Sequence, residues 1–151
     1  MGRLEGLWYV ATVYTSHPDG LDVAYKQANE AAARIISIYG ARVFCPIAHS
    51  HSLCEVYGTK EGLKGETDEG FWKWFDEPFL ERADGLIVVM MPGWVVSKGV
   101  THEREVARRA GKPTLYVSWP DLSVAALEIG EHLVYGPGCP AAVQSAIGAL
   151  Q

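Results

Sequence analysis

The chain has 151 residues, of which 48% are hydrophobic and 21% charged, and its formal net charge is −5. This length and balance predict a single globular domain over residues 1–151, and the acidic balance argues against a nucleic acid polymer as partner, because proteins that bind one usually carry a basic face. A small anionic ligand is still compatible with this charge, since backbone N–H groups at the start of a helix can hold a phosphate.

Predicted strands and helices alternate along the chain. The first strand covers the apolar residues 7–13. A helix over residues 22–39 follows, because its alanines and isoleucines fall on one stripe and Gly40 suits its C-terminal cap. The later elements are a strand at 42–46, a helix at 71–83, a strand at 85–91, a helix at 97–110, a strand at 114–118 and a last helix at 140–150.

This order of elements predicts an α/β fold with three layers, in which an open, mostly parallel sheet of the Rossmann or flavodoxin type carries helices on both faces. In such sheets ligands bind beyond the carboxyl ends of the strands. That rule selects three segments as candidate ligand sites: the residues after the first strand (14–20), a predicted loop after the second strand (47–65), and the residues after the central strand (92–103).

Glu103 has the least expected position of any charged residue. It shares a helical stripe with Val100, Ala107 and Ala110, the face that should pack against the sheet. Burial of a carboxylate is costly unless it is paired or hydrogen-bonded, although the nearby helix N-terminus favours its ionised form. Glu103 is therefore a candidate functional residue. A structural ion pair or a side chain that reaches water would give the same pattern.

Three further residues near this end of the sheet could carry chemistry. Ser97 is a good N-cap and Gly99 allows close backbone approach, so the two could form a phosphate cradle or a plain helix start. Asp76 could be a cap, a solvated charge or a general acid. Two carboxylates on one site, Asp76 and Glu103, would suit the cleavage of a glycosidic bond.

His49 and His51 lie two residues apart in the predicted loop after the second strand. The pair could bind a metal, but no convincing third and fourth ligand is evident, so we expect neither a metal nor another cofactor. A contact to a nucleobase, a capping role or a plain polar loop are the alternatives. Trp94, or an aromatic residue among 71–75, could stack on a base, although aromatic residues are mostly core.

The longest strongly apolar stretch, residues 85–91, is too short to cross a membrane. Glu5 stands where a signal peptide would turn apolar, and the three cysteines form no CxxC pair. These observations predict a cytoplasmic protein without a membrane partner.

Three short segments agree in order and spacing with a known family: Tyr9-Val10-Ala11, Asp76 followed by Ala83-Asp84, and Ser97-x-Gly99-x-x-x-Glu103. They resemble the nucleoside 2-deoxyribosyltransferase-like superfamily over about residues 7–117, and most closely its nucleotide N-hydrolase branch. The pattern Gly93-Trp94-x-x-Ser97-x-Gly99, together with His49-Ser50-His51, also resembles the DUF1937 family.

The resemblance implies an N-glycosidase that hydrolyses the base–sugar bond of a nucleoside 5'-monophosphate, or transfers the deoxyribosyl group. Glu103 would be the nucleophile, Asp76 would protonate or orient the base, Tyr9 would position the sugar or Glu103, and Ser97 would help to hold the 5'-phosphate. The family's glycine-rich phosphate turn is replaced by residues 12–18, so Tyr14, Thr15 or Ser16 would have to substitute for it. The resemblance also implies a homo-oligomer, either a dimer or a tetramer.

Two other functions fit the same residues. The altered first loop is compatible with a nucleotide-binding or sensing module that does not turn its ligand over. An NAD-cleaving glycohydrolase would also use a glutamate against a ribosyl bond.

Overall fold

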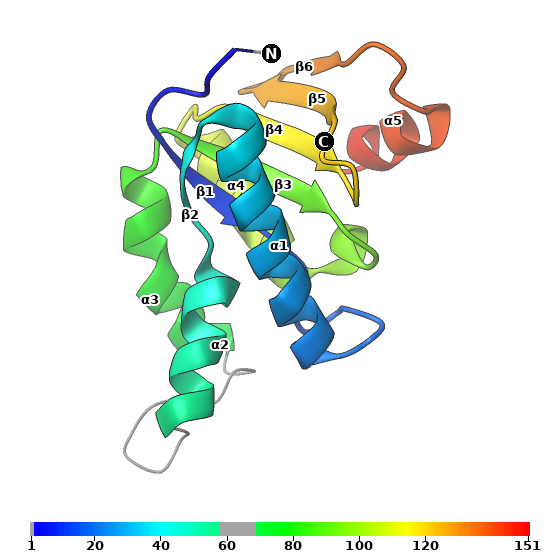
Figure 1. The fold of residues 1–151 in the computed structure, drawn as a ribbon. Coiled ribbons are helices and arrows are strands. Elements are labelled where there is room, and N and C mark those ends of the chain that lie inside the picture. Colours follow the sequence, from blue (N-terminus) through cyan, green and yellow to red (C-terminus); the bar gives the residue numbers. More distant parts are fainter. Residues whose placement is uncertain (1, 58–68) are drawn as a thin grey trace.

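A computed structural model describes residues 2–57 and 69–151 of the chain. Its centre is a six-stranded sheet with the order β2-β1-β3-β4-β5-β6 (Figure 1). Four neighbouring strands are parallel, namely β1 (Leu7–Ala11), β2 (Arg42–Phe44), β3 (Gly85–Met90) and β4 (Thr114–Ser118). The sheet ends in two antiparallel strands, β5 (Val124–Ile129) and β6 (His132–Tyr135).

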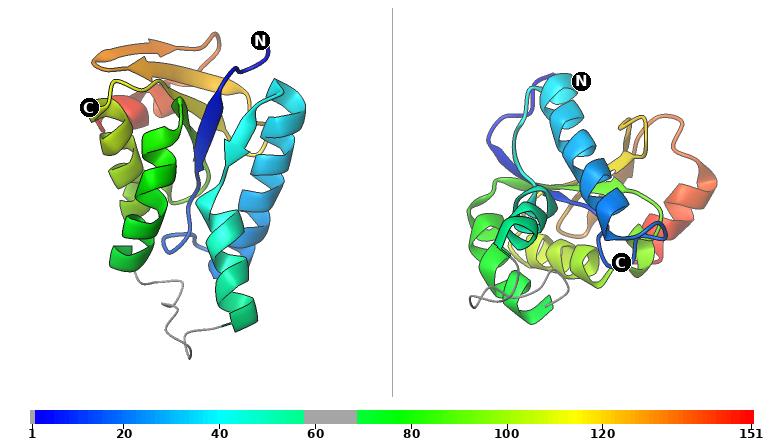
Figure 2. Two further views of the ribbon diagram at one scale, coloured as in Figure 1. Left: turned by 90° about the vertical axis from the view of Figure 1, so that its left-hand side faces the viewer. Right: turned by 60° about the horizontal axis from the view of Figure 1, so that its bottom comes forward.

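Helices cover both faces of this sheet, as Figure 2 shows. They are α1 (Leu21–Tyr39), α2 (Pro46–Tyr57), α3 (Glu69–Arg82), the short 3-10 helix η1 (Trp94–Val96), α4 (Lys98–Arg109) and α5 (Ala141–Gly148). α1 and α2 lie on one side, and α3, α4 and α5 lie on the other. The expected three-layer α/β fold with an open, mostly parallel sheet is therefore confirmed.

Two hydrophobic cores, one on each face of the sheet, follow from the alternation of side chains along β1. Trp8 and Val10 pack into the core beneath α1. Tyr9 and Ala11 point the other way, into the core beneath α3 and α4. Successive residues of a strand face opposite sides of its sheet, so the position of Tyr9 in β1 directs its side chain toward α4.

The connections from β1 define where a ligand can bind. The chain passes from β1 to β2 through α1 on one face, and from β2 to β3 through α2 and α3, with α3 on the other face. β1 and β3 are nonetheless neighbours, with Tyr9 opposite Leu86. This reversal of direction beside β1 is the point at which doubly wound sheets bind ligands, beyond the carboxyl ends of the strands.

The prediction of a loop at 47–65 is wrong for residues 47–57, because they belong to α2. Its remainder, residues 58–65, lies outside the described residues. Pro46 begins α2, where its missing N–H costs no hydrogen bond. α2 lacks a clean apolar stripe, since His49, Ser50, His51 and Ser52 follow one another in its middle. Sequence periodicity therefore gave no helical signal.

The hairpin of β5 and β6 was not predicted, and several predicted elements differ from the observed ones in length. β2 ends at Phe44 rather than at 46, and α5 covers Ala141–Gly148 rather than 140–150. β1 ends at Ala11 rather than at 13, and α3 begins at Glu69 and continues through Pro78 as one helix. In the hairpin, Gly130 has a positive φ of 59°, which suits the tight turn between the two strands. Among the described helices, none is long and apolar enough to cross a membrane.

Candidate active site

A cavity lies at the carboxyl end of β1, between α2 on one side and α3 and α4 on the other. Its empty space, with the adjoining open solvent included, is about 890 Å³. The lining residues are Tyr9, Thr12, Tyr14, Thr15, Ile47, Ser50, Trp72, Lys73, Asp76, Glu77, Leu80, Ser97, Lys98, Gly99, His102 and Glu103.

Glu103 enters this cavity from the second turn of α4. Its Oε1 accepts a hydrogen bond of 3.4 Å from the hydroxyl of Tyr9, and its Oε2 is buried without a hydrogen-bond partner among the described residues. Burial, and next the charge of Asp76, raise the pKa of Glu103 well above its usual range, whereas the Tyr9 hydrogen bond lowers it. No basic side chain of the described residues pairs with Glu103, which argues against the structural ion pair that its position also suggested.

Asp76 approaches the same cavity from α3. Its Oδ1 is likewise buried and has no hydrogen-bond partner in the part of the chain that the structure describes. Burial raises the pKa of Asp76 to about 7. Both carboxyl groups have raised pKa values, so each keeps its proton to a higher pH than an exposed carboxyl group does. Titratable groups shifted in this way in a cavity are typical of active sites.

Tyr9 completes a group of three ionisable side chains. Burial, followed by the charges of Glu103 and Asp76, raises the pKa of the Tyr9 hydroxyl well above its ordinary value. The hydroxyl therefore stays protonated, which leaves it able to donate to Glu103. Its ring is fixed against Phe44 of β2, at 5.8 Å between ring centroids.

The start of α4 forms a second part of the cavity wall. Ser97 is buried, and its Oγ accepts a hydrogen bond of 3.3 Å from the backbone N–H of Val100, so this serine is an N-cap. Among the described residues, a Cβ at Gly99 would meet only Ser97 Oγ, at 3.9 Å, so no other described residue crowds this glycine. Lys98 lines the cavity beside them. A helix N-terminus next to a lysine is suited to an anion.

The loop after β1 lies against the loop after β3. Tyr14 and Thr15 line the cavity, whereas the Oγ of Ser16 donates to the backbone oxygen of Gly93 at 3.2 Å. Gly93 has a φ of 89°, and a Cβ there would lie 2.5 Å from Ser16 O. Only glycine fits so close an approach. Of the three residues suggested to replace the glycine-rich turn, Tyr14 and Thr15 thus reach the cavity and Ser16 bridges the two loops.

Three predicted ligand contacts do not line the cavity. Trp94 packs edge-on against Tyr116, at 6.1 Å between ring centroids. His49 and His51 lie in α2, where a separation of two residues places side chains on different faces of the helix. His49 stacks on Phe75, at 5.8 Å between ring centroids, and His51 is buried among other residues of α1 and α2.

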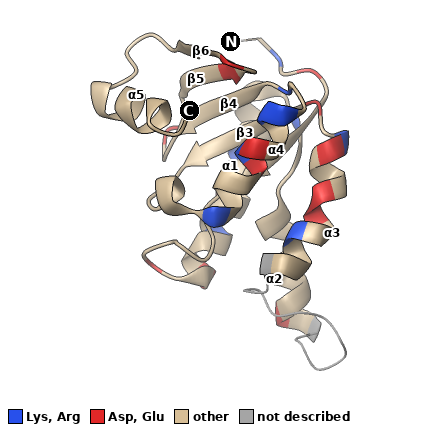
Figure 3. Ribbon diagram, turned by 180° about the vertical axis from the view of Figure 1, so that it is seen from behind, with Lys and Arg blue, Asp and Glu red and all other residues tan. Residues whose placement is uncertain are grey.

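The cavity also contains residues that the sequence reading did not single out. Lys73 and Lys98 supply positive charge, and Glu77 and His102 add further lining. Of the aromatic residues at 71–75 that could stack on a base, Trp72 lines the cavity. A usable signal exists for the two charged residues on α3, because positions 72, 73, 76, 77 and 80 form one face of that helix. Extending the stripe of Asp76 along α3 would have found Lys73 and Glu77. Acidic and basic residues are mixed on α3 and α4, as Figure 3 shows from behind.

Arg104 is a charged residue of α4 that is buried. Its Nε donates to the hydroxyl of Tyr116 at 2.7 Å. That hydroxyl donates to Oε2 of Glu128 at 2.5 Å. The guanidinium of Arg104 is thus occupied in a network with β4 and β5, on a side of α4 different from the cavity.

Comparison with known proteins gives one family. The family model described as "Domain of unknown function (DUF1937)" matches residues 6–119, from just before β1 to just after β4. No curated protein matches the chain. Every residue that lines the cavity lies within the matched segment, whereas β5, β6 and α5 lie beyond it.

Proposed function

Because the chain belongs to the DUF1937 family, whose description assigns no activity, we propose a function from the cavity itself: an N-glycosidase that cleaves the base–sugar bond of a nucleoside 5'-monophosphate. The observation that carries this proposal is the convergence of Glu103 and Asp76 on one cavity, each with a buried oxygen that has no hydrogen-bond partner among the described residues. The resemblance of the motifs around these residues to the nucleoside 2-deoxyribosyltransferase-like superfamily supports the same reading.

The proposed reaction has two steps. In the first, a carboxylate oxygen of Glu103 forms a bond to C1' of the sugar while the C1'–N bond breaks, and its electron pair leaves with the base. Asp76 gives its proton to the departing base. In the second step water attacks C1', Asp76 takes a proton from that water, and Glu103 is released as a carboxylate. A second base in place of water would make the enzyme a transferase.

The electrostatics of the cavity favour this reaction. Positive charge develops on the sugar as the base leaves. A carboxylate without a basic partner therefore interacts more strongly with the transition state than with the substrate. A carboxylate paired with an arginine or a lysine would stabilise this transition state less. Tyr9 holds Glu103 by a hydrogen bond and favours its ionised form, which is the form that attacks.

The wall formed by the start of α4 would bind the 5'-phosphate. The backbone N–H groups of Lys98 and Gly99 have no intrahelical partner because they lie in the first turn of α4. The next two N–H groups are used, since that of Val100 donates to Ser97 Oγ and that of Thr101 to Ser97 O. Gly99 leaves space for a phosphate to approach, and Lys98 and Lys73 would balance its charge.

The test is release of free base from nucleotides. The protein is incubated with ribonucleoside and deoxyribonucleoside 5'-monophosphates, the matching nucleosides and NAD, and products are separated by chromatography. We expect base release from a monophosphate, loss of release in Glu103→Gln, and full activity in Glu105→Gln, an exposed carboxylate two residues away. Release that survives Glu103→Gln unchanged would refute the assignment of the nucleophile.

The other two functions have distinct results in the same experiment. Nucleotide binding by calorimetry without any release of base over hours would favour a sensing module. Nicotinamide release from NAD, without release from any monophosphate, would favour an NAD-cleaving glycohydrolase. The expected dimer or tetramer stays a prediction, and light scattering on a sizing column tests it.

A further inference from the structure

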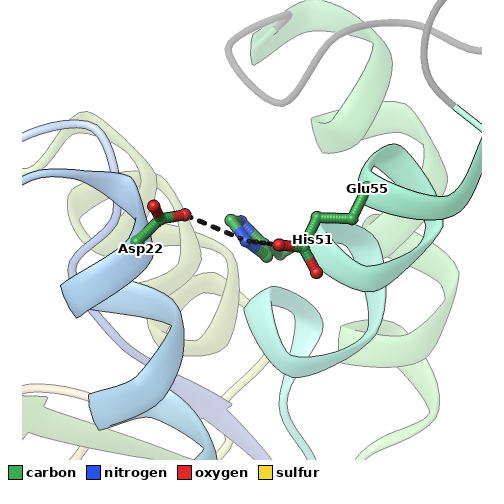
Figure 4. A group of neighbouring side chains, drawn as sticks. All are labelled: Asp22, His51 and Glu55. Carbon is green, nitrogen blue, oxygen red and sulfur yellow. Dashed lines mark ion pairs between the residues drawn. The ribbon is translucent and has the colours of Figure 1, made fainter.

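Three side chains of α1 and α2 converge on one point outside the cavity lining. They are Asp22 from the first turn of α1, and His51 and Glu55 from successive turns of α2 (Figure 4). One potential ligand atom from each residue lies within 4.8 Å of the other two. Nε2 of His51 is 3.6 Å from Oδ1 of Asp22 and 3.6 Å from Oε1 of Glu55.

His51 is held rigidly in this cluster. Its side chain is only 3% exposed, and its ring stacks on Tyr25 at 4.2 Å between ring centroids. Its Nδ1 is hydrogen-bonded to the hydroxyl of Tyr14 at 2.6 Å. When Nδ1 donates to that hydroxyl, Nε2 carries a lone pair directed at the two carboxylates. A metal-binding histidine commonly has its other ring nitrogen fixed by an oxygen in this way.

Nε2 of His51 is buried and has no hydrogen-bond partner among the described residues. A buried polar atom in this state is costly, and the nearest groups that could satisfy it stand too far away, since 3.6 Å exceeds a hydrogen bond to either carboxylate. The same distance suits two ligands of one ion. Bonds of about 2.0–2.1 Å to a tetrahedral zinc ion place its ligand atoms roughly 3.3–3.5 Å apart.

We propose that Asp22, His51 and Glu55 bind one divalent transition-metal ion of the Zn²⁺ type. An imidazole nitrogen with two carboxylate oxygens favours zinc over magnesium or calcium, which prefer oxygen ligands alone. Asp22 and Glu55 have exposed side chains, which lets them adjust to an ion and leaves room for a water ligand. The sequence alone could not show this set, because Asp22 comes from a helix 29 positions before His51.

The ion would link α1 to α2 beside the cavity. Tyr14, which is bonded to His51, lines that cavity, and Ser50 of α2 does so too. Binding would therefore fix the α2 wall relative to the loop after β1. The proposed cleavage of a base–sugar bond does not require this ion, so the two proposals stand independently.

The experiment uses the full chain after treatment with a chelator and removal of the chelator. Zn²⁺ is titrated by calorimetry, and the melting temperature is measured with Zn²⁺ or Mg²⁺. We expect one equivalent of Zn²⁺ to bind, a rise in melting temperature of about 5–10 °C at a hundredfold excess over Kd, and no comparable effect of Mg²⁺. Co²⁺ in place of Zn²⁺ should give the visible absorption of a low-symmetry site.

Variants assign the site. Asp22→Asn and Glu55→Gln should each weaken Zn²⁺ binding at least about tenfold, while Glu30→Gln, an exposed carboxylate elsewhere on α1, should leave it unchanged. Because Asp22 and Glu55 are exposed, both variants should fold. No binding below 1 mM, on the order of the weakest specific sites, or equal affinity in all three variants, would overturn the proposal. The three side chains would then be neighbours that share no metal ion, and base release would be unaffected by this result.

Discussion

The hydroxyl of Tyr9 lies 3.4 Å from Oε1 of Glu103, although 94 positions separate the two residues in the chain. β1 carries the first and α4 the second to one wall of the cavity. The contact opposes the other influences on Glu103, because burial and the charge of Asp76 raise its pKa whereas the tyrosine lowers it. Tyr9 should therefore affect activity mainly through the ionisation of Glu103.

Tyr9→Phe tests this relationship. The substitution keeps the ring that packs on Phe44 and removes the donor, so the pKa of Glu103 rises further. The nucleophile must be ionised, so the acidic limb of kcat/KM against pH should move to higher pH, with a loss of roughly tenfold on the acidic side. Profiles from pH 5 to 9 measure the shift. A uniform loss at every pH would instead mean that Tyr9 contacts the sugar without tuning Glu103.

Asp76→Asn tests the general acid. Asp76 has a pKa raised to about 7 and acts in its protonated form, so base release by the wild type should fall as pH rises through about 7. The asparagine variant cannot donate a proton and should lose about 10²–10⁴-fold at pH 6, together with this alkaline limb. Glu81→Gln, an exposed carboxylate of α3 outside the cavity lining, is the matched control and should keep full activity. An alkaline limb that persists in Asp76→Asn would assign the acid to another group.

The same substitution should make the protein more stable above neutral pH. The pKa of Asp76 is about 7 in the folded state and 3.8 in its ordinary state, so its protonation stabilises the fold fully below about pH 4, and this contribution is lost as pH rises through 7. The asparagine side chain carries no charge to desolvate. We expect Asp76→Asn to gain roughly 1–2 kcal/mol at pH 8, less than the full shift implies because solvent reaches part of the side chain, and almost nothing at pH 4.

Melting temperatures at both pH values check this expectation. A gain of 1–2 kcal/mol corresponds to about 2–8 °C for a chain of this size. Equal melting temperatures of wild type and variant at pH 8 would mean that Asp76 carries no burial penalty. The catalytic role of Asp76 is argued from the burial of its Oδ1 without a hydrogen-bond partner among the described residues. Equal melting temperatures would mean that this burial has no energetic cost.

Much of this cavity could be anticipated because it depends on short-range patterns and one topological rule. Parallel strands direct their carboxyl ends to one edge, so residues after β1 and at the start of α4 had to meet there. Helical spacing located Glu103, and the turn signals before α4 located Ser97. The family match over residues 6–119 agrees with the DUF1937 resemblance of the motifs.

The remaining features depend on partners that periodicity does not show. α2 has no apolar stripe, so its histidines were assigned to a loop. In the helix that they occupy, a spacing of two residues places His49 and His51 on different faces. The burial of Arg104 was not predicted, because its partner Glu128 belongs to β5, which was itself not predicted. A buried charge can be recognised only when the residue that compensates it has been placed.

Lys98 provides a test of the phosphate position. The residue is exposed at the start of α4, so Lys98→Ala should fold normally. Loss of its charge should raise KM for a nucleoside monophosphate by about tenfold, because one charge-assisted contact is removed, and leave KM for the matching nucleoside unchanged. Lys26→Ala, an exposed lysine of α1, serves as the control. Equal effects on nucleotide and nucleoside would place the phosphate elsewhere.

The network of Arg104, Tyr116 and Glu128 should fix the rotation of α4, and thereby the direction of Glu103. Arg104→Met removes the cation that lies 3.8 Å from Oε2 of Glu128 and leaves that carboxylate buried, at 4% exposure, without its opposite charge. Loss of one partner of a buried pair costs about 3–5 kcal/mol. Urea unfolding should register this loss, and the double variant Arg104→Met with Glu128→Leu should recover most of it, because no uncompensated charge is then buried.

If the double variant also regains the base release that Arg104→Met loses, the network acts by orienting α4. Stability regained without activity would show that Arg104 contributes to the reaction in some other way.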